Sequence, residues 1–164
     1  MNRATVVFVC TGNTCRSPLA MALARSRWPQ HEFVSAGLQA VAGMPVADFA
    51  RQVAAERGTD LADHGARPLD RTLLARADWL IGMTRSHVAQ LGRVLGDGEG
   101  PRLGLLGAPG RDLRGRPTPD VEEVADPIGG SLETYRTCAD QLERLLRGWE
   151  DVLAGPAGER GGPA

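Results

Sequence analysis

One segment near the N-terminus, Cys10–Ser17 (CTGNTCRS), joins a predicted strand to a predicted helix. The run before it, residues 5–10, is short, apolar and β-branched, which is typical of a buried strand. Ser17 and Pro18 predict a helix start, with the serine hydroxyl as N-cap and proline at the first helical position. A loop that joins strand to helix in this way is typical of a parallel α/β sheet, where such loops bind ligands at the carboxyl ends of the strands.

The rest of the chain repeats this alternation of strand and helix signals. Short apolar runs predict three further strands, and longer periodic runs predict the helices that connect them. The last helix has the clearest amphipathic pattern, and a loop rich in glycine, proline and charge precedes it. The predicted strands lie near residues 33–35, 78–83 and 102–106, the first of them closed by Ala36-Gly37. The predicted helices lie near 17–28, 46–57, 69–76, 85–95 and 132–153, and the loop at 107–125. This order predicts a parallel sheet covered on both faces by helices.

Length and composition are those of a single-domain globular protein. The 164 residues suit one domain, expected at residues 1–154, and the Gly/Pro-rich tail at 155–164 is expected to be disordered. A net charge of −1 predicts no nucleic-acid partner and no binding to anionic membranes, and no apolar run is long enough to span a bilayer. Three cysteines do not form a disulfide framework. They favour a reducing compartment, so we expect the cytoplasm.

The Cys10–Ser17 segment has the residues of an anion-binding loop with a nucleophile at its base. The loop N–H groups and the N-terminus of the next helix would point at a bound anion, and their field favours a thiolate at Cys10. Cys10 can attack phosphorus, and Arg16 offers a planar fork of donors to two phosphoryl oxygens. The loop therefore predicts a site for a phosphate monoester. The remaining residues expected to bind phosphate are Thr11, Gly12, Asn13, Thr14, Cys15 and Ser17.

Three residues have particular structural roles in this prediction. Gly12 lets the backbone approach the anion closely, and Asn13 tolerates the left-handed conformation that a loop with inward-pointing N–H groups requires. Ser17 can donate its hydroxyl to the sulfur of Cys10, which helps the thiolate to form and to leave. A nucleotide-binding P-loop is the nearest alternative, but it requires a lysine, and this sequence contains none.

The leaving group needs a proton, and Asp126 is the predicted general acid. It lies in the sequence ADPIGGS, on the loop just before the last predicted helix. Pro127 restricts the backbone of Asp126, and the two glycines allow the loop to fold over the phosphate site. Taken alone, Asp126 would be read as an acidic turn residue, so its catalytic role depends on the rest of the pattern.

Together these motifs resemble the low-molecular-weight protein tyrosine phosphatase family, over about residues 4–150. The markers are VCTGNTCRSP at 9–18, Ser-Ala-Gly at 35–37, Asp-His at 63–64 and Asp-Pro at 126–127. The resemblance implies Cys10 as nucleophile, Arg16 as phosphate ligand and Asp126 as general acid and then base. It implies that Ser35 and His64 support the motif asparagine. It also implies a three-layer α/β fold, a four-stranded parallel sheet flanked by helices, with no metal and no cofactor.

Two positions are similar to the protein arginine phosphatase branch of that family. Tyrosine phosphatases of the family usually have a bulky aliphatic residue, often isoleucine, where this chain has Thr14. They also usually have an aromatic residue beside the Asp-Pro pair, where this chain has Ile128. A threonine hydroxyl gives a guanidinium group a polar partner. The branch commonly has phenylalanine at the Ile128 position, so the resemblance is incomplete there.

We therefore expect a cysteine-dependent protein phosphatase that forms a phosphocysteine intermediate and releases inorganic phosphate. Its partners would be phosphorylated proteins or peptides, with phosphoarginine favoured over phosphotyrosine and a phosphotyrosine-specific enzyme as the main alternative. An arsenate reductase of the same fold would need two further cysteines after the third strand, and residues 78–95 contain none. A catalytically inactive phosphate-binding module would not need all of Cys10, Arg16 and Asp126, so the presence of the complete set argues against this alternative.

The other cysteines, the histidines and the tryptophans lead to simpler expectations. Cys15 is expected to form a reversible disulfide with Cys10 after oxidation, with packing beneath the loop as the alternative. Cys138 is expected in the core, because it lies on the apolar face of the last helix. His31 and His87 have no partner at metal-ligand spacing and are expected at the surface. The tryptophans expected in the core or at its rim are Trp28, Trp79 and Trp149.

Overall fold

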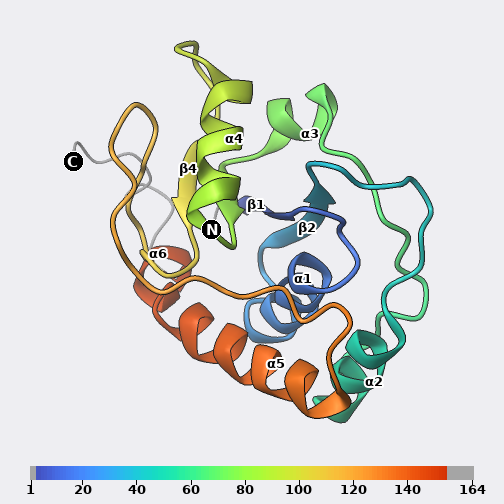
Figure 1. Cartoon of the computed structure of the whole chain (residues 1–164). Coiled ribbons are helices and arrows are strands. Elements are labelled where there is room, and N and C mark those ends of the chain that lie inside the picture. The colour runs from blue at the N-terminus through green and yellow to red at the C-terminus, as the bar shows by residue number, and fades with distance from the viewer. Residues whose placement is uncertain (1–2, 155–164) are drawn as a thin grey trace.

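Four parallel strands form one sheet in the order β2-β1-β3-β4 in the computed structural model, which describes residues 3–154 (Figure 1). The central strand β1 pairs with β2 on one side and with β3 on the other. Because the strands run in the same direction, their carboxyl ends meet at one edge, where Cys10 ends β1. The strands are β1 (Thr5–Cys10), β2 (Glu32–Gly37), β3 (Trp79–Gly82) and β4 (Arg102–Leu105).

Helices cover both faces of the sheet, because successive side chains of a strand point to opposite faces. Val6 and Phe8 of β1 face a core built with α1, α2 and α5, whereas Val7 and Val9 face α3 and α4. Figure 1 shows α1 and α5 on one side of the strands and α4 on the other. The helices are α1 (Arg16–Arg27), α2 (Asp48–Glu56), α3 (Arg71–Arg76), α4 (Arg85–Leu95), α5 (Leu132–Arg147) and α6 (Glu150–Ala154). The three-layer fold predicted from the sequence is confirmed.

The amphipathic run at 132–153 forms two helices, so the prediction of one continuous helix is wrong. The break lies at Gly148 and Trp149, between α5 and α6. Glycine has a low helix propensity, and Trp149 is fully buried with its indole N–H donating to the Leu106 carbonyl at 2.9 Å. This contact with a distant part of the chain turns the backbone where the apolar periodicity alone continues.

The side chains expected in the core are buried. Trp28, Trp79 and Trp149 are each at most 2% exposed, and Cys138 on α5 is also buried. The rings of Trp79 and Trp149 meet edge to face with centroids 5.0 Å apart, which joins the chain after α5 to β3. His31 is only partly exposed, contrary to expectation, because its Nδ1 accepts a backbone N–H bond.

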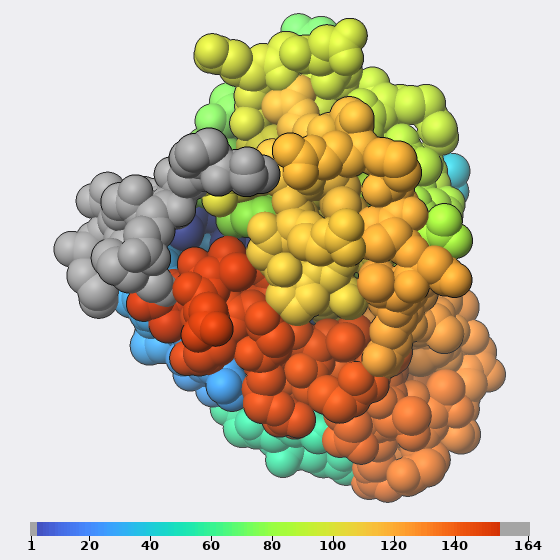
Figure 2. All heavy atoms as spheres, turned by 90° about the vertical axis from the view of Figure 1, so that its left-hand side faces the viewer, coloured from blue at the N-terminus to red at the C-terminus, as the bar shows by residue number. Residues whose placement is uncertain are grey.

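Residues 106–131 connect β4 to α5 across the surface, in agreement with their Gly/Pro-rich composition. Figure 2 shows this segment running from the region of α4 toward α5 over one face of the molecule. Glu122 pairs with Arg144 of α5, and Glu123 accepts from the backbone N–H of Arg85 at 2.6 Å. These contacts hold the segment that carries Asp126 against the helices on both sides of the sheet.

Two further expectations concern membrane-spanning helices and the C-terminal tail. Within residues 3–154, no helix has both the length and the apolar character needed to cross a membrane. The tail at 155–164, which the composition predicts to be disordered, lies outside the described residues.

Candidate functional site

Cys10 lies at the base of the loop that connects β1 to α1. It is buried, and its sulfur lies 3.0 Å from the hydroxyl oxygen of Ser17, within hydrogen-bond distance. The prediction of Ser17 as the helix N-cap is wrong, because α1 already begins at Arg16, with Cys15 as the cap residue. Ser17 therefore lies inside the first turn of α1. Its hydroxyl lies next to the sulfur of Cys10 and does not cap the backbone N–H groups of the helix.

Asn13 connects the loop to two other parts of the structure. Its φ of 57° is the only positive value at a non-glycine residue in the described part of the chain, as the loop motif predicts. Its buried side chain donates from Nδ2 to the Ser17 oxygen at 2.8 Å, and its Oδ1 accepts from the Arg67 backbone N–H at 3.0 Å. Its carbonyl oxygen accepts from Nε2 of His64 at 3.0 Å. These contacts fix the curvature of the loop.

Ser35 does not contact Asn13 in the way that the family resemblance implies. Its hydroxyl is buried and has no hydrogen-bond partner among the described residues. The Arg67 backbone N–H and the Ser17 hydroxyl are the partners of the Asn13 side chain instead. His64 does contact Asn13, but through the backbone carbonyl. Burial lowers the pKa of His64, which favours its neutral form.

Arg16 is a buried arginine with unused donors. Its Nη1 donates to the Val124 carbonyl at 3.0 Å, and its Nη2 lies 3.6 Å from the carboxylate of Asp126. Its Nε is buried without a hydrogen-bond partner among residues 3–154. A buried N–H group without a partner is costly, so an anion in the loop would complete the hydrogen bonding of this guanidinium group.

The loop is closely packed against β2. A Cβ at Gly37, the last residue of β2, would lie 2.7 Å from the Thr11 carbonyl oxygen, so only glycine fits there. A Cβ at Gly12 would meet nothing closer than Oγ1 of Thr14 at 3.7 Å, so the protein itself does not require glycine at that position. Within the described chain, no side chain caps the N-terminus of α1. Its unpaired N–H groups are a favourable environment for a phosphate group.

Asp126 lies at the start of a glycine-containing turn before α5. Its side chain is 46% exposed, and its Oδ1 accepts from the Ile128 N–H at 3.1 Å. Gly129 has a φ of 79°, and a Cβ at Gly130 would lie 2.9 Å from a backbone carbonyl oxygen. The turn therefore requires both glycines, in agreement with the sequence pattern. It brings Asp126 next to Arg16, from which it is far in sequence.

Cys15 belongs to the same loop as Cys10, and its sulfur lies 3.4 Å from the hydroxyl of Tyr135 on α5. Burial raises the pKa of the Cys15 thiol, although hydrogen bonds with Tyr135 and Thr14 act in the opposite direction. Burial also raises the pKa of Cys138, to about 12. Both thiols are therefore protonated at neutral pH, and both are free.

His87 contacts the loop, although its sequence environment predicts a surface residue. It is 3% exposed on the first turn of α4, and its Nε2 lies 3.0 Å from Oγ1 of Thr11. Burial lowers the pKa of His87 to about 4, and the positive charge of Arg16 acts in the same direction. The available signal was its position, because residues just after β3 lie at the same sheet edge as Cys10.

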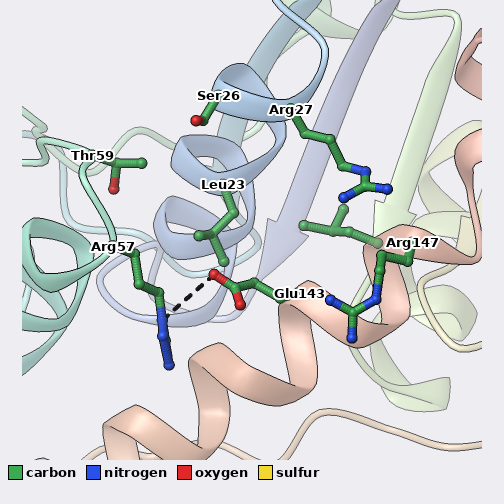
Figure 3. A pocket seen from close by; sticks show the side chains of 8 residues that line it. Leu23, Ser26, Arg27, Arg57, Thr59, Glu143 and Arg147 are labelled. Atoms are coloured by element: carbon green, nitrogen blue, oxygen red, sulfur yellow. Dashed lines mark ion pairs between the residues drawn. The ribbon is translucent and has the colours of Figure 1, made fainter.

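A separate hollow on the molecule contains none of these residues. It has a volume of about 350 Å³ and is lined by side chains of α1, α5 and the segment after α2 (Figure 3). Leu23 and Leu146 supply apolar surface, and Arg57 pairs with Glu143 at 3.7 Å. The candidate active site is therefore assigned from the chemistry of the loop and not from the size of a hollow.

Comparison with known proteins agrees with the chemistry of the loop. The family model described as low molecular weight phosphotyrosine protein phosphatase matches residues 5–155. The chain is 30% identical over 153 residues to a probable low molecular weight protein-tyrosine-phosphatase, EpsP, of Ralstonia nicotianae, covering 88% of this chain and 92% of that protein. It is 33% identical over 143 residues to a protein-arginine-phosphatase of Geobacillus stearothermophilus, covering 86% of this chain and 90% of that protein.

A solved structure shows the same fold. The YwlE arginine phosphatase from Geobacillus stearothermophilus matches with a TM-score of 0.78 at 30% sequence identity, covering 98% of this chain and 99% of that chain. Relatives named as tyrosine phosphatases and as arginine phosphatases are thus similar to this chain at comparable identity. The chain belongs to the low molecular weight phosphotyrosine protein phosphatase family, and it is a protein phosphatase.

Proposed function

We propose that this enzyme hydrolyses phosphorylated side chains through a phosphocysteine intermediate on Cys10, with phosphoarginine preferred over phosphotyrosine. The observation that carries the proposal is that residues far apart in the sequence lie together at one loop. Cys10 and the buried Arg16 belong to the loop, and the Asp126 carboxylate lies 3.6 Å from Arg16. Together they supply a nucleophile, an anion ligand and an acid.

In the first step, the Cys10 thiolate attacks phosphorus, and the bond from phosphorus to the leaving group breaks. Asn13 donates to the oxygen of Ser17. The Ser17 hydroxyl has two acceptors for its own proton, the Cys10 sulfur at 3.0 Å and the Ala36 carbonyl at 3.5 Å. Donation to the nearer sulfur stabilises the thiolate. Arg16 and the loop N–H groups bind the phosphoryl oxygens. Asp126, in its protonated form, gives its proton to the leaving oxygen or nitrogen.

In the second step, a water molecule attacks phosphorus of the phosphocysteine. Asp126, now a carboxylate, takes a proton from this water, and the sulfur of Cys10 leaves as a thiolate. The products are inorganic phosphate and the regenerated enzyme. Apart from the substrate and this water molecule, the steps use only groups of this chain.

Two side chains support a preference for phosphoarginine. Thr14 is partly buried in the loop and presents a small polar group there, with Oγ1 3.8 Å from the sulfur of Cys15. Ile128 is 66% exposed beside Asp126, where residues 126–131 include no aromatic side chain. A hydroxyl can accept a hydrogen bond from a guanidinium group, and the Asp126 turn offers no aromatic ring for a phenyl ring to stack on.

One observation favours phosphotyrosine as a second candidate. Phe49, at the start of α2, is 39% exposed, and its ring meets Tyr135 edge to face at a centroid distance of 5.7 Å. Tyr135 contacts Cys15, and the N–H of Ala47 donates to the Thr14 carbonyl at 3.0 Å. An exposed aromatic ring therefore lies close to the phosphate loop, where it can pack against a substrate ring.

Replacing Thr14 with isoleucine tests the preference directly. We expect Thr14→Ile to lower kcat/KM for phosphoarginine and to spare or raise it for phosphotyrosine. The lost contact is one hydrogen bond to a charged group, so the ratio of the two values should move by about ten- to a hundredfold. The measurement is the parallel turnover of phosphoarginine and phosphotyrosine peptides. Thr14→Ser, which keeps the hydroxyl, is the matched control and should retain the wild-type ratio.

Two results would contradict the preference. A proportional loss on both substrates would mean that Thr14 only shapes the loop. A wild-type enzyme that strongly prefers phosphotyrosine would assign selectivity to the aromatic surface at Phe49.

Oxidation is expected to link Cys10 to Cys15. Peroxide converts the Cys10 thiolate to a sulfenic acid, and the Cys15 thiol then forms the disulfide with loss of water. Thiol reductants should restore full activity. Mass spectrometry of the peroxide-treated protein should find the crosslinked peptide, and Cys15→Ser should instead accumulate sulfinic or sulfonic acid at Cys10. Irreversible oxidation of Cys10 in the wild-type protein, with no crosslink, would exclude this protective role.

The free thiols also bear on the cellular compartment in which the enzyme acts. Cys10, Cys15 and Cys138 form no disulfide with one another. The proposed mechanism needs Cys10 as a free thiol, which reducing compartments maintain, so we propose that the enzyme acts on phosphorylated proteins of the cytoplasm.

A further inference from the structure

The hydrogen bonds of His87 determine which of its ring nitrogens carries the proton. Nδ1 accepts from the Met83 backbone N–H at 3.3 Å. A ring nitrogen that accepts a hydrogen bond has no proton, so the proton of the neutral imidazole is on Nε2. Nε2 lies 3.0 Å from Oγ1 of Thr11. His87 is therefore the donor in this pair, and the Thr11 oxygen is the acceptor.

Because Thr11 accepts in this pair, it does not donate its own hydroxyl proton to His87. A hydroxyl group has one proton and two lone pairs, and His87 occupies one lone pair. Thr11 directly follows Cys10, and it is the exposed residue of the loop. Its O–H group can therefore donate to a molecule bound over Cys10. The neutral ring that this arrangement needs agrees with the low pKa of His87, about 4, which results mainly from burial.

The backbone and the Cβ of His87 are tightly constrained. A Cβ at Gly82, the last residue of β3, would lie 3.0 Å from the Cβ of His87, so the sequence has its smallest residue where the histidine packs. The Thr84 hydroxyl accepts from the His87 backbone N–H at 3.2 Å and caps α4. The residue is thus held by the end of β3 and by the first turn of α4. Its ring is held through Nδ1 by the Met83 N–H, and Nε2 is the ring nitrogen that contacts the loop.

We propose that Thr11 binds substrate by donating its hydroxyl proton to a phosphoryl oxygen, and that His87 is the positioning residue that orients this hydroxyl. This inference rests on the proposed function, because it concerns the same phosphate site. It involves the phosphoryl group, which phosphoarginine and phosphotyrosine share. It is therefore independent of the preference between these two substrates.

A matched pair of Thr11 variants tests the hydroxyl. Thr11→Val keeps the shape of the side chain without the O–H group, and Thr11→Ser keeps the O–H group. We expect Thr11→Val to weaken inhibition by inorganic phosphate and to lower kcat/KM for an aryl phosphate, each by about ten- to a hundredfold, the effect of one hydrogen bond to a charged group. Thr11→Ser, because it keeps the donor, should retain more phosphate affinity and a higher kcat/KM than Thr11→Val. Equal losses in both variants would overturn the proposal.

A double-mutant cycle tests the role of His87. If His87 acts through Thr11, adding His87→Phe to Thr11→Val should cause no further loss of phosphate affinity, whereas His87→Phe alone should weaken it. Additive losses of phosphate affinity would mean that His87 does not act through Thr11, and would overturn its positioning role. His87→Gln keeps an N–H donor, so with Thr11 present it should retain more phosphate affinity than His87→Phe. In the Thr11→Val protein the two His87 variants should bind phosphate equally. This second comparison decides the question if the phenylalanine variant does not fold.

Binding measurements separate this proposal from the proposed function. Titration calorimetry with inorganic phosphate reports the Thr11 contact without turnover. A wild-type protein that hydrolyses no aryl phosphate would contradict the proposed function, while a weaker phosphate affinity in Thr11→Val would still support the Thr11 contact. An active wild-type enzyme whose phosphate affinity is unchanged by Thr11→Val would overturn the Thr11 proposal alone.

Discussion

Replacing Cys10 with serine is expected to abolish hydrolysis of aryl phosphate while leaving the binding of inorganic phosphate intact. The hydroxyl of serine is a far weaker nucleophile and a poorer leaving group than a thiolate at neutral pH. The guanidinium group of Arg16 and the loop N–H groups remain in place, so the anion site itself survives. Turnover of a chromogenic aryl phosphate and calorimetry with inorganic phosphate measure the two properties separately.

Cys138→Ser is the matched control for this variant. Cys138 is a buried free thiol on α5 that belongs to no part of the loop, so its replacement should leave most of the activity. Substantial turnover by Cys10→Ser would contradict the covalent mechanism. Loss of phosphate binding in Cys10→Ser would mean instead that the substitution distorts the loop.

Asp126→Asn is expected to slow the enzyme by roughly 10²–10⁴-fold, the usual range for a general acid. The amide has no proton of suitable acidity for the leaving group, although it keeps the size of the carboxyl group. The loss should shrink as the leaving group becomes more acidic, because a good leaving group departs without a proton. A series of aryl phosphates with increasingly acidic phenols measures this dependence.

The other carboxylates of the same segment provide the comparison. Glu122 is paired with Arg144, and Glu123 accepts from the Arg85 backbone N–H, so both carboxylates are engaged by partners other than Arg16. Asp120→Asn is the control and should retain near-wild-type rates. If Asp126→Asn loses the same factor with good and poor leaving groups, Asp126 is not the acid, and Asp120, Glu122 and Glu123 become the next candidates.

Local sequence patterns predicted the elements that form the site. The predicted bounds of β1 and α4 agree with the structure, because a short β-branched run and an 11-residue apolar periodicity are properties of neighbouring residues. The left-handed conformation of Asn13 and the glycine turn after Asp126 were also predictable, since each follows from the conformational freedom of one residue type. The position of Cys10 at the carboxyl edge follows from the alternation of strands and helices.

Contacts between distant residues decided how the side chains of the site are held. The backbone of Arg67 holds the side chain of Asn13, the carbonyl of Val124 holds Arg16, and His87 holds Thr11.

None of these contacts has a local sequence signal, because each partner comes from a different segment of the chain. Arg67 lies between β2 and β3, His87 between β3 and β4, and Val124 after β4. The residue types in the Cys10–Ser17 segment thus determined by themselves which chemistry the loop can perform. Only the tertiary structure decided which neighbours orient those residues, since hydrogen bonds between remote segments form only after the strands have paired and the helices have packed on them.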